Sequence, residues 1–377
     1  MMRNSKYSPI HQLVHTLSYG DAISGEVLAL RRALRDLGVE SEIYSLHTHP
    51  KLEGESRSIE DFPKNDSAAQ VILHYSLGSP LNDLYREIRS DSKTLIYHNL
   101  TPAKWFSGIN PRITSDIRQG EAELPELLAL STRIIADSTF NADEIREKGF
   151  EADVLPLPID PERWSMKANE GIVDLVRNTP GPHLLHVGRL APNKCIEDII
   201  RAFYFFRNHI SKNARLWLVG IDIDTELYSF SLKHMVHQLG LSEAVEFPGC
   251  MADSEVRALY ENADLYLCMS EHEGFCLPVI EAMHFGLPVI AYHSSALPET
   301  ISEGGVLVKK KDPAFLAALF AQILSSQEMQ NALIVAGKKR VKQLSYSKFA
   351  SHVESLFLNG FSSDVVSEHD KKQKKVG

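Results

Sequence analysis

The sequence lacks long apolar runs and lacks an excess of positive charge. No segment approaches the roughly 18 uninterrupted apolar residues that a membrane-spanning helix requires, and residues 1–12 contain no apolar core of signal-peptide length. The 40 Lys and Arg residues are outnumbered by 49 Asp and Glu, which gives a formal net charge of −9. A general nucleic-acid-binding protein needs a basic surface to contact phosphates, so this class is excluded. We expect a cytoplasmic protein that binds no nucleic acid.

Cysteine is equally scarce. The chain has four cysteines, and none forms a Cys-x-x-Cys pair: Cys195, Cys250, Cys268 and Cys276. Four singly placed cysteines fit reduced thiols better than a zinc knuckle or a disulfide framework. We expect four reduced thiols in buried packing positions.

Positive charge gathers on the first helix candidate and in the tail. The helix carries Arg31, Arg32 and Arg35, and residues 371–375 contain four lysines. One interpretation is a solvated helix face and a disordered chain end. The other is weak attraction to an anionic membrane surface or a lipid-phosphate acceptor, which would bring the protein to the inner membrane face.

The length and the pattern of apolar residues favour two α/β domains. A chain of 377 residues is long for one hydrophobic core, and short apolar runs alternate with longer amphipathic stretches, as in parallel α/β folds. The Pro-rich segment 155–161 cannot sit in a central strand, so we place the domain boundary just after it. The predicted units are residues 1–165, residues 166–345, and a C-terminal helix with a disordered basic tail, residues 346–377.

Each domain is predicted to be doubly wound and Rossmann-like, with ligands outside the carboxyl ends of the strands. The predicted strands are residues 10–17, 42–46, 70–75, 94–98 and 133–136, then 183–187, 216–219, 245–247, 265–268 and 289–292. The predicted helices are residues 25–37, 80–88, 121–130 and 139–148, then 194–208, 225–239, 254–262, 278–285 and 313–324.

The segment 271–286 carries two acids around a helix start. Glu273 precedes a glycine-led turn, and Glu281 lies about one turn inside a helix that a proline opens. Proline is favoured at the first helical position because it has no N–H to satisfy, so the amides of residues 274–276 are expected to point outward. Such amides attract oxygen atoms, and the acids accept hydrogen bonds from hydroxyl groups. This predicts a site for an anionic sugar ligand, while an ordinary helix turn beside a surface acid stays an alternative.

A second motif follows the strand predicted at residues 183–187. Gly188 allows a close backbone approach, and Arg189 and Lys194 supply two cations at a strand-to-helix turn. Arginine offers a fork to phosphate oxygens and lysine a compact point charge, so the pair suits a diphosphate. Because Arg and Lys are common near helix starts, a purely structural interpretation of this motif alone is open.

These motifs occur in a characteristic order. They are Gly188-Arg189-Leu190 with Lys194, Leu218-Val219-Gly220, residues 245–249, and Glu273 and Glu281 separated by seven residues. Over most of residues 183–300 this order resembles the donor half of family 4 retaining glycosyltransferases of GT-B fold, two Rossmann-like domains that face a central cleft. Residues 19–23 and 97–102 look most like those of bacterial surface-polysaccharide transferases that build mannose- or rhamnose-containing chains.

The resemblance implies a role for each matching residue. Arg189 and Lys194 would hold the donor diphosphate, Glu281 the ribose, and Glu273 the transferred sugar. His98 would approach the donor sugar from the first domain across the cleft. The remaining donor-side positions implied by the match are Gly188, Gly274, Phe275, Cys276, Gly20 and Asp21. One departure is Cys195, where the family often has glycine.

The resemblance also implies a reaction. Such enzymes move a hexose from a nucleotide sugar with retained anomeric configuration, and use no metal or other cofactor. GDP-mannose is the favoured donor, and a growing glycan or lipid-linked acceptor of a cell-surface polysaccharide such as lipopolysaccharide is the expected acceptor. The alternative within the sequence is Asp222-Ile223-Asp224, a pattern with which another transferase fold binds manganese, although two Asp before a helix suit a turn and cap equally well.

Other polar residues carry weaker signals. His183 and His186 flank a buried strand and His234 and His237 lie on a helix surface, so we interpret all four as structural. Ser270 lacks the Gly-x-Ser-x-Gly elbow of hydrolases. Two other functions stay open: another enzyme on this fold, such as a sugar-nucleotide epimerase or a phosphorylase, and a non-catalytic scaffold that binds a sugar nucleotide.

The C-terminal segment 347–358 is amphipathic. Its apolar residues Phe349, Val353, Leu356 and Phe357 lie near helical spacing, so one face should pack on another element. The resemblance implies that this helix crosses back to the first domain, and packing within the second domain is the alternative.

Overall fold

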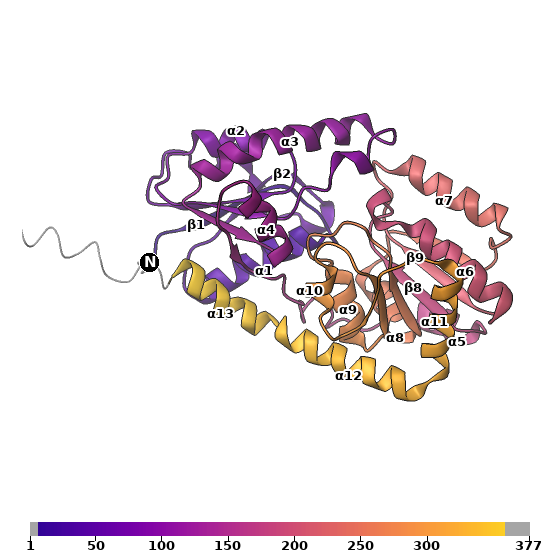
Figure 1. Ribbon diagram of the computed structural model, residues 1–377. Coiled ribbons are helices and arrows are strands. Elements are labelled where there is room, and N and C mark those ends of the chain that lie inside the picture. The colour runs from indigo at the N-terminus through magenta and orange to yellow at the C-terminus, as the bar shows by residue number, and fades with distance from the viewer. Residues whose placement is uncertain (1–6, 359–377) are drawn as a thin grey trace, which may run out of the picture.

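The computed structural model describes residues 7–358, which form two parallel β-sheets with helices on both faces (Figure 1). The predicted α/β architecture of two doubly wound units is therefore confirmed. No helix within residues 7–358 is both long enough and apolar enough to cross a membrane. The lysine-rich tail at 371–375, with its two interpretations, lies outside the described residues. The helix arginines pair with acids of this chain: Arg31 with Glu55, Arg32 with Asp160 and Glu162, and Arg35 with Glu42.

The first sheet has seven strands in the order β3-β2-β1-β4-β5-β6-β7, all parallel. The order reverses at β1 and β4, and such a switch point is where open α/β sheets bind ligands. The strands are β1 (Ile10–Leu17), β2 (Ile43–Thr48), β3 (Arg57–Ser58), β4 (Gln70–Tyr75), β5 (Lys93–Tyr97), β6 (Arg133–Ala136) and β7 (Asp153–Val154). The helices are α1 (Ala22–Asp36), α2 (Pro80–Glu87), α3 (Pro111–Leu130) and α4 (Thr139–Glu147), with short turns η1 (Pro50–Leu52), η2 (Ile59–Asp61) and η3 (Ala103–Trp105).

Helix α3 is longer than the sequence pattern predicted. The expected helix at 121–130 begins instead at Pro111, and Asn110 caps it by accepting a hydrogen bond from the Ile113 amide at 3.1 Å. Proline suits this first position. The early turns are mostly polar and give no clear apolar stripe, which is why periodicity missed them.

The second sheet has six parallel strands in the order β10-β9-β8-β11-β12-β13. The strands are β8 (His183–Val187), β9 (Arg215–Val219), β10 (Val245–Gly249), β11 (Leu265–Cys268), β12 (Val289–Tyr292) and β13 (Val306–Val308). The helices are α5 (Glu170–Asn178), α6 (Ile196–His209), α7 (Glu226–Gln238), α8 (Asp253–Asn262), α9 (Leu277–Phe285), α10 (Leu297–Ile301), α11 (Pro313–Ser325) and α12 (Gln327–Gln343), with the turn η4 (Pro192–Lys194).

Alternate residues of a central strand pack into two separate hydrophobic cores. In β11, Leu265 and Leu267 join the cluster under α6 and α11, while Tyr266 and Cys268 join the cluster under α8 and α9. This is the period-2 alternation of a strand that is covered on both faces. The strand is therefore held rigidly, and the residues that follow it are fixed at the edge of the sheet.

The C-terminal helix returns to the first domain. From α12 the chain runs along one side of the molecule into α13 (Tyr346–Phe357), which lies beside α1 (Figure 1). Phe349, Val353 and Phe357 are buried in one cluster with Leu30 and Ala33 of α1. At the junction, the Ile159 amide donates to Leu344 O at 3.0 Å, so both crossing segments lie side by side.

Candidate functional site

The loops after β8 and β11 meet in a buried ion pair. Lys194 ends the η4 turn that follows β8, and Glu273 lies in the loop that follows β11. The Lys194 Nζ atom is 2.7 Å from each carboxylate oxygen of Glu273, and the side chains are 20% and 8% exposed. The sequence placed these residues 79 positions apart, and the structure brings them together.

Each partner of this ion pair fixes the charge of the other. Burial by itself would raise the pKa of Glu273, but the ammonium group of Lys194 outweighs it, and the pKa is lowered. Burial by itself would lower the pKa of Lys194, but the carboxylate outweighs it and raises the pKa to about 12. Both side chains are therefore charged at neutral pH.

The loop after Glu273 presents three unbonded amides. The Glu273 amide donates to Ser295 Oγ at 2.8 Å, but the amides of Gly274, Phe275 and Cys276 donate to no acceptor within residues 7–358. Cys276 is the N-cap of α9 and has a left-handed backbone, φ 77° and ψ 68°. Consecutive N–H groups at a helix start form a site for an anion or for sugar hydroxyls.

The same loop is anchored from inside the second domain. The Phe275 side chain is 4% exposed and belongs to the core under α9. Its carbonyl accepts a hydrogen bond from Thr300 Oγ1 at 2.6 Å. The buried ring and the bonded carbonyl fix the backbone, so the unbonded amides have a defined direction.

Glu281 lies in α9, within a second network of charges. Arg163 Nη1 donates to its Oε1 at 2.7 Å, and the Tyr260 hydroxyl donates to its Oε2 at 3.1 Å. Arg163 also reaches Asp253 at 2.9 Å. Burial raises the pKa of Glu281, and the charge of Arg163 opposes this shift. Neither Arg163 nor Tyr260 belongs to a sequence motif, so the sequence gives no sign of them, and only the fold brings them to Glu281.

Arg189 lies beside the loop that follows β9. Its Nη2 donates to Ile223 O at 2.7 Å, while its Nε has no hydrogen-bond partner within residues 7–358. Burial lowers its pKa, and Asp224 and Asp21 oppose this effect. Close backbone packing supports the turn, because a Cβ at Gly220 would lie 1.9 Å from Gly188 O. Only glycine can occupy position 220 without moving the Gly188 turn.

The first loop of the first domain reaches the second domain. Gly20 has a φ of +79°, and Asp21 caps α1 by accepting from the Ser24 amide at 2.9 Å. Next to them, the Tyr19 hydroxyl accepts from the Asp253 amide at 3.3 Å. The Gly20-Asp21 turn therefore lies at the boundary between the domains.

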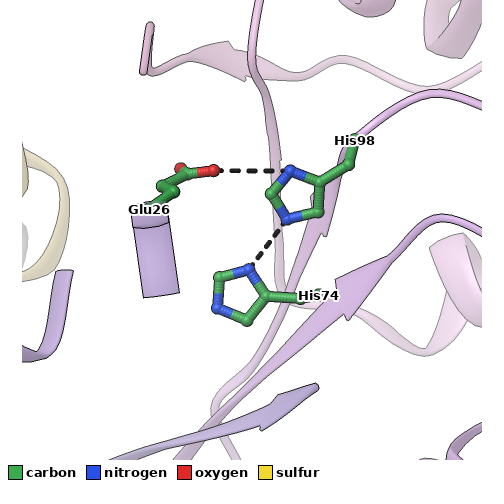
Figure 2. A group of neighbouring side chains, drawn as sticks. All are labelled: Glu26, His74 and His98. Carbon is green, nitrogen blue, oxygen red and sulfur yellow. Dashed lines mark hydrogen bonds and ion pairs between the residues drawn. The ribbon is translucent and has the colours of Figure 1, made fainter. Parts of the chain in front are cut away.

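His98 does not present its side chain to the cleft as expected. Its ring is fully buried, with Nδ1 3.0 Å from Asp137 Oδ2 and 3.3 Å from Glu26 Oε2. On the opposite side of the ring, Nε2 is 2.8 Å from His74 Nδ1, and Figure 2 shows His98 between Glu26 and His74. Burial would lower the pKa of His98, but the two acids outweigh it and raise the pKa to about 9. The expected orientation is wrong because these acids hold a charged imidazolium inside the domain.

The group of Glu26, His74 and His98 has ligand types that metals use. Its geometry is that of a chain, since the His98 ring pairs with Glu26 as an ion pair through Nδ1 and hydrogen-bonds to His74 through the opposite nitrogen, Nε2 (Figure 2). His74 continues the chain to Gln12 Oε1 at 2.8 Å. One ion cannot bind both sides of a single imidazole, so these three residues do not form a chelate.

Although its ring is buried, His98 marks the place where the domains touch. A Cβ at Gly274 would lie 2.9 Å from Asn99 Cβ and 3.0 Å from His98 O. Ser138 Oγ donates to Gly274 O at 2.7 Å, and His272 Nε2 bonds to Asn99 Oδ1. The loop with the unbonded amides is therefore held by the first domain as well as by the second.

Several weaker candidates have structural partners. Asp224 accepts from Arg112 of α3 at 2.7 Å, and Asp222 is 3.7 Å from Lys233, so these two Asp do not form an open acidic pair. His183 and His186 are buried and bond to Thr179 O and Leu267 O.

The expectation of four buried thiols is wrong for two of them. Cys195 and Cys268 are buried, but Cys276 is half-buried and Cys250 is exposed, because Cys276 ends a loop and Cys250 follows β10. All four cysteines are free thiols.

The residues of this site fall within a region that matches a known protein family. The sequence pattern of the family described as "Glycosyl transferases group 1" matches residues 169–340, which include Arg189, Lys194, Glu273 and Glu281. Over these residues, close to half of the chain, the protein is similar to the group 1 glycosyltransferases. The resemblance to family 4 glycosyltransferases of GT-B fold is thereby confirmed.

Three curated relatives are similar at low identity. D-inositol 3-phosphate glycosyltransferase of Corynebacterium glutamicum is 28% identical over 183 residues, 48% of this chain and 44% of the relative. MMP alpha-(1->4)-mannosyltransferase of Mycolicibacterium hassiacum is 25% identical over 245 residues, 62% of this chain and 54% of the relative. O-antigen chain mannosyltransferase B of Escherichia coli is 24% identical over 165 residues, 44% of this chain and 42% of the relative. The matches thus span about half the length of these relatives.

Solved structures share the fold over nearly the whole chain. Sucrose-phosphate synthase from Thermosynechococcus elongatus superimposes with a TM-score of 0.75 at 19% identity, covering 95% of this chain and all of that one. HepE of Anabaena, solved in complex with UDP-glucose, superimposes with a TM-score of 0.67 at 17% identity, covering 93% of this chain and 99% of that one. At this identity the likeness establishes the fold.

Proposed function

We propose that the protein transfers a hexose, with retention of anomeric configuration, from a nucleotide sugar to a growing glycan or a lipid-linked acceptor. The observation that carries this proposal is the Lys194–Glu273 ion pair next to three unbonded amides at the start of α9. A cation and N–H donors suit a diphosphate, and a carboxylate suits sugar hydroxyls. The match of residues 169–340 to the glycosyltransferase family supports the same reaction class.

The leaving diphosphate is the group that needs stabilisation. Lys194, Arg189 and the amides of residues 274–276 supply positive charge and donors where negative charge develops as the glycosidic bond breaks. These groups supply what a bound cation supplies in other transferases, so the proposed reaction needs no metal and no other cofactor.

Each of the two acids binds a different part of the donor in this proposal. Glu281 faces the ribose in this proposal: its two oxygens accept one bond each from Arg163 and Tyr260, and a carboxylate has further acceptor positions for hydroxyls. Glu273, held by Lys194, faces the hexose. Gly188 and the Gly20-Asp21 turn line the approach from the two domains.

His98 acts through its backbone and through its charge in this proposal. Its carbonyl lies next to Gly274, and its imidazolium is fixed by two buried acids. Holding the 273–276 loop in place when the domains close, and excluding water there, is a role that this position can perform without ring contact to the sugar.

Mannose from GDP-mannose is the proposed donor. Two of the relatives are named as mannosyltransferases, and one of them as acting on an O-antigen chain. A lipid-linked surface polysaccharide precursor is the acceptor that follows from this likeness, with peripheral contact to the inner membrane face. The cytoplasmic location stays a prediction.

The test is a transfer assay with the full chain in the presence of a chelator. The donors are GDP-mannose, UDP-glucose and their analogues, and alkyl mannosides stand in for glycan and lipid-linked acceptors. We expect acceptor-dependent release of GDP and an α-linked product by NMR, lost in Lys194→Ala and kept in Lys212→Ala, an exposed lysine of the same domain.

Three other outcomes would contradict the proposal. Conversion of the donor sugar without an acceptor would indicate an epimerase. Tight binding of a sugar nucleotide without turnover on any acceptor would indicate a scaffold. Activity that disappears with chelator and returns with manganese would contradict the metal-free mechanism.

A further inference from the structure

Two thiols face each other at the base of the loop that carries Glu273. Cys268 is the last residue of β11 and Cys276 is the N-cap of α9, and their sulfur atoms are 3.9 Å apart. Both are free thiols. The seven residues between them, 269–275, include Glu273 and two of the three unbonded amides. A bond between the two sulfurs would close this loop at its base.

The two cysteines differ in their exposure to solvent, as expected when one thiol reacts first and the other resolves the mixed disulfide. Cys268 is 1% exposed, whereas Cys276 is half-buried, so a reagent in solution meets Cys276 first. The Cys276 thiol hydrogen-bonds to the Cys268 sulfur, which lowers the pKa of Cys268. The same hydrogen bond, together with burial, raises the pKa of Cys276 well above its usual value, and the charge of Lys194 opposes this rise. The thiolate is therefore favoured on Cys268, and Cys276 becomes the nucleophile when its proton passes to the Cys268 sulfur along their hydrogen bond.

A bound metal ion fits this place less well. Glu273 would be the third ligand beside the two thiols. Both of its oxygens already bind the Lys194 ammonium at 2.7 Å, and a cation would have to displace that charge. Each of the two sulfur atoms therefore has the other as its available partner for a covalent bond.

We propose that Cys268 and Cys276 form a reversible disulfide that switches the donor site off, an inference that rests on the proposed function. The oxidant is a small-molecule disulfide. The Cys276 sulfur attacks it as the Cys276 proton passes to the Cys268 sulfur, which forms a mixed disulfide on Cys276 and releases one small thiolate. The Cys268 thiol then gives its proton to the released small thiolate and attacks the Cys276 sulfur, which closes the protein disulfide and releases the second small thiolate. The protein loses two hydrogens, and the small disulfide becomes two thiols.

The geometry explains why this bond would stop transfer. A disulfide holds its sulfurs about 2 Å apart, so the two atoms must approach by about 2 Å. Cys268 is fixed within the sheet, so most of the movement falls on Cys276 and on the start of α9. The amides of residues 274–276 turn with it, and Glu273 shifts against Lys194. A pocket that needs these amides to point at the diphosphate would then no longer bind it.

The test treats the reduced full-length protein with glutathione disulfide and measures both chemistry and binding. After unfolding and alkylation, the oxidised protein should carry two alkyl groups in place of four, with Cys268 and Cys276 protected. The rise in Tm that a nucleoside diphosphate gives the reduced protein should disappear, and dithiothreitol should restore it.

Variants separate the steps of the proposal. Cys268→Ser, or Cys268→Ala if serine unfolds this buried position, lacks the resolving thiol and should retain a glutathione adduct on Cys276. Cys250→Ser removes the exposed thiol and should behave as the unmodified chain does. Thiol mapping needs no substrate, so the disulfide is tested even if no donor is found.

Two results would overturn the proposal. One is a wild-type protein that keeps a glutathione adduct on Cys276 while Cys268 remains open to alkylation. The other is complete formation of the 268–276 disulfide with an unchanged thermal shift by the nucleotide.

Discussion

Gly274→Ala tests whether contact between the domains positions the site. The new Cβ would lie 2.9 Å from Asn99 Cβ, 3.0 Å from His98 O and 3.1 Å from Asn141 Nδ2, and all three atoms belong to the first domain. Separations below about 3 Å between such atoms do not persist, so a neighbour must move. Two of these contacts are not flexible side-chain ends, so we expect the domains to part slightly.

The size of the effect follows from overpacking. An extra methyl group in a filled interface costs about 1–3 kcal/mol, and each 1.4 kcal/mol is about tenfold in an equilibrium. If closure positions the donor against the acceptor, kcat/KM should fall by roughly 5- to 150-fold. The affinity for a nucleoside diphosphate should change little, because Lys194, Arg189 and the amides stay within the second domain.

Gly25→Ala is the matched control. Gly25 lies in α1, and a Cβ there has no atom within 4 Å among the described residues. Alanine is favoured over glycine in a helix by about 1 kcal/mol, so this variant should keep its activity and gain stability. Transfer kinetics with the best donor and calorimetric nucleotide binding give the comparison. Full kcat/KM in Gly274→Ala, or equal losses in both variants, would refute the role of domain contact.

Three further predictions concern the charges and the C-terminal helix. Glu273→Gln leaves Lys194 without its partner and should lower the free energy of unfolding by about 3 kcal/mol, measured in urea; wild-type stability would show that the pair is not coupled. The pKa of Glu26 is raised from 4.5 to about 8 and that of His98 from 6.5 to about 9, so the folded state binds more protons than the unfolded state between these values, and stability should fall as pH rises from 4.5 to about 9. Glu26→Gln should flatten this fall, and an unchanged slope in thermal melts would argue against the buried cluster. A chain that ends before Tyr346 loses the three buried apolar side chains of α13 and should destabilise the first domain by about 5 kcal/mol in calorimetry, whereas an intact first transition would contradict the packing on α1.

The features that the sequence predicted correctly are those that depend on residues close together in the chain. The strand at residues 10–17 has the predicted bounds, because its largely buried residues end shortly before the Gly20 turn. Glu273 and Lys194 could be chosen because each follows a strand in a parallel sheet, where carboxyl ends meet at one edge. The unbonded amides of residues 274–276 also followed from the proline that opens α9.

The parts that it missed depend on contacts between distant segments. The orientation of His98 was wrong, since nothing in its local sequence indicates that Glu26 and Asp137 enclose its ring. Arg163 gave no signal, because its two acid partners lie 90 and 118 residues away. The facing thiols of Cys268 and Cys276 were likewise invisible from their spacing.

The most direct test of the central claim is nucleotide binding by the reduced, metal-free protein. Thermal shifts with GDP, UDP, ADP and dTDP in chelator should show that at least one raises Tm, with about 2.7 kcal/mol of added stability at 100 times its Kd. The shift should be lost when Arg189 and Lys194 are both replaced by alanine and kept in Lys212→Ala. No shift with any of the four, or an undiminished shift in the double variant, would contradict the claim that this loop pair holds a diphosphate.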